Sequence, residues 1–254
     1  MGVAHDQFAF YPVDEPGLSN GLVDLFINLA KPIREVDPEA LIYTDPVGRA
    51  TMEELKRMTP YVDIWCPNRS GYLLKEGQDK LAYIKSTGKS VWTYECMGNA
   101  KHQSPLGYYR AQAWLVSHYG LAGMGFWSYC TSSADPWFTP EGTNDYLLIY
   151  QGKGVVSSKR WEAIRDGIED YGILNELKNA VARSKDSSSL PFVNEARRLL
   201  ETEAFDIARY CGLDEYGTEP GIGGMKELRE IEDARWDKIK NVRRKIAKLL
   251  QELK

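Results

Sequence analysis

The sequence has little of what would place it in several large classes of protein. Its 254 residues include only four cysteines and three histidines. The cysteines are widely spaced and form no C-x-x-C pair, so they indicate neither a disulfide-stapled scaffold nor a zinc module. No stretch approaches the roughly 20 apolar residues that a membrane-spanning helix requires. The polar opening residues, MGVAHDQ, do not have the pattern of a secretory signal.

A large excess of charge is also missing. The formal net charge is −4 and the pI is near 5.6, which argues against binding nucleic acid or an anionic membrane through bulk charge. No G-x-G-x-x-G follows an apolar segment, so a dinucleotide-binding fold has no support. We therefore expect a neutral small molecule or polymer as partner, no nucleic acid, no membrane span, no metal and no cofactor. A secretory signal on a longer parent chain would make the protein extracytoplasmic, and none is visible in these residues.

Five short apolar segments recur instead, each ending in polar, aromatic or proline residues. They are FAFYPVDEP (8–16), ALIYTDP (40–46), VDIWCPN (62–68), SVWTYEC (90–96) and AGMGFWSYC (122–130). Amphipathic segments between them predict helices, so the alternation indicates parallel strands joined by right-handed crossovers. Most strand starts are about 20 to 30 residues apart, which is the size of a β/α unit.

A barrel and an open doubly wound sheet would both accommodate this pattern. The barrel is favoured because the unusual polar residues all lie at strand ends, where several barrel strands build an active site together. Five strands are too few to close an eight-stranded barrel. We therefore expect an α/β fold in which residues 1–155 form the later part of a (β/α) TIM-type barrel and carry its catalytic face. Self-association, or an N-terminal barrel half outside this sequence, would cover the open sheet edges.

Residues 156–254 are predicted to form a helical region that packs on the barrel or on a partner. Ser157 or Ser158 is the expected N-cap of a long amphipathic helix. Further helices are expected at about 191–211 and about 225–253. In the last of these, apolar residues recur at three- and four-residue steps and predict one buried face; they are Leu228, Ile231, Ile239, Val242, Ile246, Leu249 and Leu253.

The adjacent carboxylates Asp14 and Glu15 are the predicted catalytic pair. Neighbouring side chains on a regular strand point to opposite faces, so both can address one ligand only if the strand end bends. Pro16 and Gly17 follow directly and favour such a bend. Two carboxylates held close repel, and can divide into a protonated acid and an ionised partner. The simpler interpretation is a solvated strand exit whose aspartate caps the next turn.

Equivalent strand ends supply the residues expected to bind substrate. Tyrosine and tryptophan, of which the chain has fifteen and seven, cover the apolar faces of sugar rings and also donate hydrogen bonds, although core packing is the common use of aromatics. We expect a glycan or oligosaccharide substrate. The predicted substrate-binding residues are Tyr11, Asp45, Trp65, Asn68, Tyr94, Glu95, Trp127, Tyr129 and Trp137.

Glu95 has two interpretations. If its carboxyl stood about 5 to 5.5 Å from that of Glu15, it could be the nucleophile of a retaining double displacement. Otherwise it hydrogen-bonds a substrate hydroxyl or a neighbouring arginine, which is favoured because the Asp14–Glu15 pair already offers a complete mechanism. The cysteines at strand ends, Cys66, Cys96 and Cys130, lack a short chelating pair and are expected to be small buried hydrophobic side chains rather than metal ligands.

Four segments together carry a family resemblance: YPVDEPG (11–17), WTYECMG (92–98), RAQAWLVSHYGLAGMGFWSY (110–129) and DYLLIYQGKGVVSSKRWEAIRDGIEDYGILNEL (145–177). They resemble glycoside hydrolase family 123 and the related "domain of unknown function 4091" proteins over roughly residues 8–180. The last segment, with its Y-x-G, S-x-R and R-x-G-I-E-D-Y elements, is the most specific. The resemblance implies a (β/α) barrel with an N-acetylhexosaminidase activity of the β-N-acetylgalactosaminidase type.

The same resemblance implies substrate-assisted, retaining catalysis. The 2-acetamido oxygen of the substrate attacks the anomeric carbon, so the enzyme needs no nucleophile of its own. Glu15 would be the general acid/base, and Asp14 would orient the acetamide and stabilise the positive charge of the oxazolinium-like intermediate. Tyr94, Trp127 and Tyr129 would shape the pocket. The alternatives are a glycosidase that uses Glu95 as nucleophile and a noncatalytic carbohydrate-binding or scaffold fragment.

Overall fold

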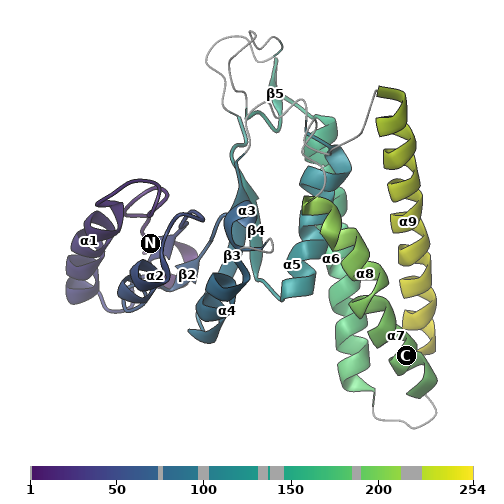
Figure 1. Cartoon of the computed structure of the whole chain (residues 1–254), viewed down its shortest axis with the longest axis horizontal. Coiled ribbons are helices and arrows are strands. Elements are labelled where there is room, and N and C mark those ends of the chain that lie inside the picture. Colours follow the sequence, from purple (N-terminus) through teal and green to yellow (C-terminus); the bar gives the residue numbers. More distant parts are fainter. Residues whose placement is uncertain are drawn as a thin grey trace. The chain divides into compact units, whose positions relative to one another are not determined.

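The computed structural model describes residues 2–73, 77–96, 103–130, 137, 146–184, 190–212 and 225–253. The chain divides into two compact units (Figure 1), one formed by Met1–Cys96 with Leu121–Trp127 and the other by Met97–Gly120 with Ser128–Lys254. These limits differ from the predicted boundary at residue 155, because helix α5 (Ala111–Tyr119) packs against α6 (Lys159–Arg183) and α8 (Glu203–Ala208) of the second unit.

A four-stranded parallel sheet forms the centre of the first unit. Its strands are β1 (Tyr43–Thr44), β2 (Ile64–Trp65), β3 (Ser90–Glu95) and β4 (Gly123–Phe126). They pair in chain order, β1-β2-β3-β4, and every pairing is parallel. The predicted α/β class with parallel strands is therefore confirmed. The predicted first strand, 8–16, is reduced to a single parallel bridge between Phe10 and Ile42, because the chain turns away just after it.

Helices lie between the strands, as the sequence predicts. The elements of this unit are η1 (His5–Gln7), α1 (Leu22–Val36), α2 (Met52–Met58), α3 (Arg69–Tyr72) and α4 (Gln78–Ser86). Helix α2 begins with a capping box, in which the Thr51 hydroxyl accepts from the Glu54 amide and the Glu54 carboxylate accepts from the Thr51 amide. The helices bury apolar faces that include Phe26, Leu55 and Ile84, each fully buried. Burial of this surface is the main stabilising term of the unit.

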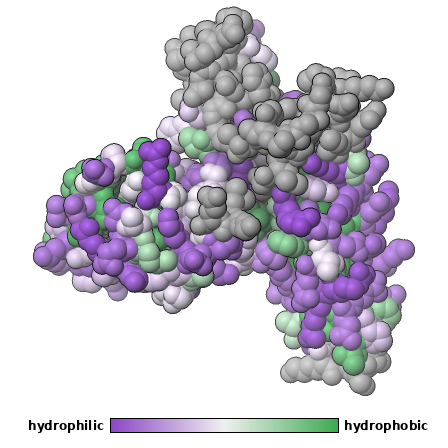
Figure 2. Space-filling view, in the orientation of Figure 1, coloured by the Kyte–Doolittle hydropathy of each residue, from purple (hydrophilic) through white to green (hydrophobic). Residues whose placement is uncertain are grey.

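In its described residues, the second unit is a helical bundle with a short β-hairpin. Its elements are η4 (Pro105–Arg110), α5, β5 (Tyr150–Gln151), β6 (Val155–Val156), α6, α7 (Leu190–Glu201), α8, η6 (Arg209–Gly212) and α9 (Met225–Glu252). Ser158 is the N-cap of α6, where its hydroxyl accepts from the Trp161 amide at 3.2 Å, which confirms the prediction. On the face seen in Figure 2, side chains of these helices are mostly hydrophilic.

The predicted helices near the C-terminus are present with two differences. The predicted helix 191–211 is divided into α7, α8 and η6, and the break between α7 and α8 falls at Thr202, where φ is −110° and ψ is −73°. In α9 the expected apolar face is buried at Ile239, Val242, Ile246 and Leu249. The side chains of Leu228 and Ile231 lie outside the described residues. Within the described ranges, no helix combines the length and apolar character that crossing a bilayer requires.

A buried charged cluster ties α6 to the start of α5 and to α9. Asp170 is fully buried, and its carboxylate accepts hydrogen bonds from Arg110 Nε and Nη2 at 2.7 and 3.0 Å. The Trp114 indole N–H donates to the same carboxylate at 2.8 Å, and Arg243 Nη1 lies 3.0 Å from it. Such a group is stable in a low-dielectric interior only because each of its charges is paired and hydrogen-bonded.

Candidate functional site

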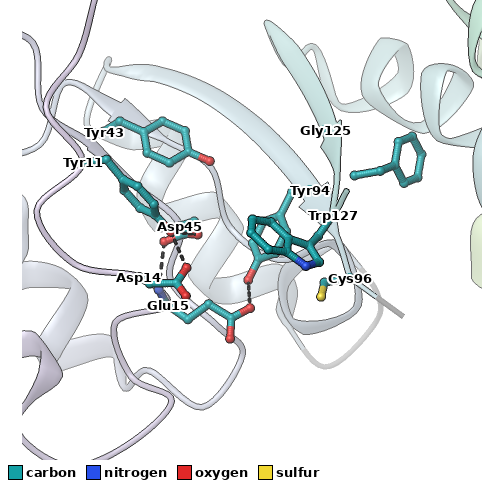
Figure 3. A pocket seen from close by; sticks show the side chains of 10 residues that line it. Tyr11, Asp14, Glu15, Tyr43, Asp45, Tyr94, Cys96, Gly125 and Trp127 are labelled. Carbon is teal, nitrogen blue, oxygen red and sulfur yellow. Dashed lines mark hydrogen bonds between the residues drawn. The ribbon is translucent and has the colours of Figure 1, made fainter. Parts of the chain in front are cut away.

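A pocket of about 430 Å³ lies in the first unit, at the carboxyl ends of its strands. Figure 3 shows Tyr11, Asp14, Glu15, Asp45, Tyr94 and Trp127 around this space, all six of which were predicted site residues. The sequence reasoning missed the other four residues that line it. These are Tyr43, Cys96, Gly125 and Phe126.

The strand end bends sharply at the carboxylate pair, as expected. Glu15 has a φ of +47° and is, among the described residues, the one non-glycine residue with a positive φ. The turn is closed by a hydrogen bond from the Leu18 amide to the Glu15 carbonyl at 3.0 Å. A left-handed conformation costs a residue with a Cβ about 1–2 kcal/mol, and such strain persists where the surroundings impose it, commonly at active sites. The bend allows both Asp14 and Glu15 to face one pocket.

Gly17 is required for this turn. Its φ is +93°, and a Cβ added there would lie 2.6 Å from Ala50 Cβ and 2.7 Å from Ala50 Cα. We expect Gly17→Ala to lower the free energy of unfolding by about 2–3 kcal/mol, since strain and overlap act together. Urea denaturation would measure this loss. The matched control is Gly88→Ala, at φ +70° with nothing within 4 Å of the added Cβ; equal losses in the two variants would contradict the role of the Ala50 contact.

Asp14 and Asp45 are joined through Tyr11. The Tyr11 hydroxyl oxygen lies 2.5 Å from Asp14 Oδ1 and 2.5 Å from Asp45 Oδ2. Desolvation, reinforced by the two carboxylates, raises the pKa of Tyr11 well above its ordinary value, so the phenol stays protonated. Asp45 is only 6% exposed, and burial raises its pKa to about 7 despite the hydrogen bonds that it accepts.

Glu15 is held by a second tyrosine. The Tyr94 hydroxyl donates to Glu15 Oε1, and in Figure 3 the two side chains point toward one another across the pocket. Burial and the neighbouring Glu15 carboxylate raise the pKa of Tyr94 far above the ordinary value, so this phenol also remains a donor. Each member of the carboxylate pair therefore has one oxygen fixed by a tyrosine.

Two of the four missed residues, Tyr43 and Cys96, could have been found from the period of two along a strand. Tyr43 precedes Asp45 by two residues, and Cys96 follows Tyr94 by two, so each pair falls on one face of its strand. Tyr43 packs edge-on against Tyr11, with ring centroids 5.1 Å apart. Burial raises the pKa of the Cys96 thiol to about 11, so it contributes a neutral wall.

Three of the predicted substrate-binding residues are placed elsewhere in the first unit. Trp65 is fully buried in the core. Glu95 is 2% exposed, and its carboxylate lies 3.3 Å from Arg69 Nε while it accepts from Asn68 Nδ2 at 3.2 Å. Because Glu95 follows Tyr94 on the same strand, the two side chains point to opposite faces, and only Tyr94 lines the pocket.

Two further predicted residues belong to the second unit. Tyr129 is half exposed and packs edge-on against Trp161 at 5.5 Å, whereas Trp137 stacks on Tyr150 at 4.4 Å. Neither lines the pocket of the first unit.

The cysteines at strand ends are buried only in part. Cys66 is buried as expected, and burial raises the pKa of its thiol to about 12. Cys96 and Cys130 are partly exposed, which corrects the expectation that all three are core residues. In the described part of the chain, no group of three or more histidine, cysteine and acidic side chains is arranged to hold a metal ion.

Comparisons with known proteins bear on the family. An X-ray structure of the endo-beta-1,4-mannanase from Thermotoga petrophila is similar at 16% identity and a TM-score of 0.42, covering 66% of this chain and 45% of that one. Comparison with curated proteins gave no match. Residues 28–177, more than half of the 254, match the model of the glycoside hydrolase 123 catalytic domain. Asp14 and Glu15 precede the matched residues. As the sequence resemblance predicted, this chain belongs to glycoside hydrolase family 123.

Proposed function

We propose that this chain is the catalytic portion of a retaining glycosidase that removes terminal β-linked N-acetylhexosamine, first of all N-acetylgalactosamine, from a glycan. The observation that carries the proposal is that consecutive carboxylates, Asp14 and Glu15, line one pocket from a strained turn. Membership of a glycoside hydrolase family supports the reaction class. The substrate and the mechanism follow from the family resemblance of the sequence.

In the proposed first step the 2-acetamido oxygen of the substrate attacks its own anomeric carbon. Glu15, as the acid, gives its proton to the glycosidic oxygen, and the leaving group departs as an alcohol. The bond from Tyr94 occupies Oε1, so Oε2 is the oxygen that would address the leaving group. Asp14 would accept a hydrogen bond from the acetamide N–H and stabilise the positive charge that develops on the oxazolinium-like ring.

In the proposed second step Glu15 acts as the base. It removes a proton from a water molecule, whose oxygen attacks the anomeric carbon and reopens the ring with retained configuration. Both steps use the same carboxyl group, and the tyrosine that holds it keeps its position between them. No nucleophilic side chain is required.

The walls of the pocket suit a sugar ring. Trp127 is 57% exposed, and together with Tyr43 and Phe126 it offers aromatic surface to the apolar C–H face of a pyranose. The volume of about 430 Å³ lies within the range of about 300–1,000 Å³ that is typical of small-molecule sites.

We further propose that the sheet belongs to a (β/α) barrel. The parallel strands follow one another in chain order, helices lie between them, and the polar residues of the pocket stand at their carboxyl ends. These are the features of the active-site face of such barrels.

The nucleophile alternative is disfavoured. The Glu95 carboxylate is paired with Arg69 and accepts from the amides of Ser70 and Cys96, at 3.2 and 2.9 Å. The Glu95 carboxylate lies outside the pocket, and it would have to break these interactions before it could reach a sugar.

The decisive experiment compares three aryl glycosides: β-N-acetylgalactosaminide, β-N-acetylglucosaminide and β-galactoside. We expect release of the chromophore from the acetamido sugars, faster from the first, and none from the galactoside, which lacks the internal nucleophile. Turnover of the galactoside at a comparable rate would exclude obligatory substrate assistance. Binding of N-acetylgalactosamine without hydrolysis of any of the three would support the noncatalytic interpretation.

A further inference from the structure

The hydrogen bonds around Tyr11 require more than one proton. Its hydroxyl oxygen lies at 2.5 Å from an oxygen of each of two carboxyl groups, Asp14 and Asp45. A phenolic hydroxyl carries one proton and can donate it to one of them. For the second short contact to be a hydrogen bond, one carboxyl must carry a proton and donate it to the phenolic oxygen. The three side chains therefore hold two protons between them.

Burial identifies Asp45 as the protonated carboxyl. Asp45 is 6% exposed, whereas Asp14 is exposed to solvent, and an ionised carboxylate is far less stable where water is excluded. The titratable groups that act on Asp45 or are acted on by it, from every strand end around it, are Tyr11, Asp14, Tyr43, Cys66 and Tyr94. All of them are acids, so none of these groups supplies a positive charge to offset a negative one on Asp45.

The other oxygen of Asp45 reaches the second catalytic residue. Asp45 Oδ1 accepts from the backbone amide of Glu15 at 3.0 Å. That amide belongs to the residue whose φ is +47°, so the bond helps to hold the strained turn. One buried side chain thus contacts both halves of the pair, Asp14 through a phenol and Glu15 through the backbone.

We propose that Asp45 is a positioning residue that stands protonated behind the catalytic pair, donating to Tyr11, which donates to Asp14, while it accepts the Glu15 amide. This role rests on the proposed function, in which Asp14 and Glu15 act on the substrate. Asp45 itself would touch neither the sugar nor the leaving group. Its loss of a proton would leave the single proton of Tyr11 between two anions and release Asp14 from its fixed orientation.

The pKa of Asp45, raised by burial to about 7, gives the inference a pH window. An acid whose pKa is higher in the folded than in the unfolded chain contributes most to stability while both states are protonated, which for Asp45 is below a pH of 3.8, its pKa in the unfolded chain. This contribution to the free energy of unfolding is lost as the pH rises through about 7, the pKa in the folded chain. Asp45→Asn replaces the acid by a neutral amide that can still donate to Tyr11 and accept from Glu15. The variant should therefore lack this dependence on pH.

Melting temperatures measured between pH 4.5 and 7.5 test, without a substrate, whether Asp45 is protonated in the folded protein. We expect the wild type to lose about 5 °C or more relative to Asp45→Asn across this range. Asp63→Asn is the matched control, because Asp63 pairs with Arg34 in the same unit; its melting temperature should be lowered throughout, without a growing trend. If the melting temperatures of the wild type and Asp45→Asn changed in parallel with pH, the proposal that Asp45 is protonated would be overturned.

Kinetics test the positioning role. At pH 6, Asp45→Ala, which removes the bonds to Tyr11 and to the Glu15 amide, and Tyr11→Phe, which cuts the link to Asp14, should each lower kcat about tenfold or more with little change in KM, and the conservative Asp45→Asn should restore most of this loss. With a dinitrophenyl leaving group, which needs little protonation, the wild type should lose activity above pH 7 and Asp45→Asn should not. A folded Asp45→Asn as inactive as Tyr11→Phe would overturn the role. An inactive wild type would defeat the proposed function, and the melting curves would still decide where the proton lies.

Discussion

Replacing Glu15 by glutamine is expected to lower kcat/KM on an aryl β-N-acetylgalactosaminide by about 10²–10⁴-fold, the usual contribution of a general acid or base. Glutamine has the same shape as glutamate, and its amide oxygen can still accept the hydrogen bond that the Tyr94 hydroxyl donates to Glu15 Oε1 in the wild type. It can neither protonate the departing oxygen nor accept a proton from water. The fold should therefore persist while the chemistry stops, and circular dichroism of the variant would check the first point.

The leaving group separates loss of the acid from general damage to the site. An aryl oxygen of low basicity needs little protonation to depart, so the first step of Glu15→Gln should recover with a dinitrophenyl in place of a nitrophenyl leaving group. The control is Glu53→Gln, an exposed carboxylate in the first turn of α2, which should leave the kinetics unchanged. An equal loss with both leaving groups would remove Glu15 from the acid role.

The sequence predicted those features of the pocket that depend on strand ends. Apolar runs separated by amphipathic segments lead to a parallel sheet in chain order, and parallel strands bring their carboxyl ends to one edge. A Pro-Gly step after two carboxylates predicts a bend, which is found at Glu15. Position along the chain was therefore enough to place Asp14, Glu15 and Asp45 together.

The sequence could not predict which side of a strand each residue faces. Tyr94 and Glu95 follow one another on β3, and both are chemically suited to a sugar site. Strand geometry requires that their side chains point to opposite faces of the sheet. Which of the two faces the pocket depends on the register of β3 with β2 and β4, and that register is set only when the strands pair. Trp65 was misplaced for the same reason, since it ends β2 with its side chain in the core.

The most specific segment of the family resemblance, 145–177, supplies no residue to the lining of the pocket. The segments 110–129 and 145–177 contain Arg110 and Asp170, which form the buried ion pair of the second unit. Gly167 belongs to the same contact, because a Cβ there would lie 2.9 Å from the Arg110 carbonyl oxygen. In the S-x-R element, Ser158 caps α6 and Arg160 Nε donates to the Leu147 carbonyl at 2.7 Å. Packing and buried polar bonds account for these sequence elements.

Asp170→Asn is accordingly expected to lower the free energy of unfolding of the second unit by about 3–5 kcal/mol, the usual cost of breaking a buried ion pair. The substitution leaves the guanidinium of Arg110, whose side chain is 6% exposed, beside a neutral amide that cannot accept in the same bidentate way. It also weakens the bonds from Trp114 and Arg243. Urea denaturation followed by tryptophan fluorescence would measure the loss, because Trp114 contacts the substituted group.

The matched control for this loss is Asp237→Asn on α9. Asp237 pairs with Lys240 at 3.2 Å, but its side chain is 71% exposed, so solvent screens the pair and the denaturation midpoint should not move. If Asp170→Asn shifted the midpoint no more than this control, the buried cluster would not stabilise the unit. A large shift confined to Asp170→Asn, with the pocket of the first unit still binding N-acetylgalactosamine, would show that the most specific sequence elements of this chain serve its stability rather than its chemistry.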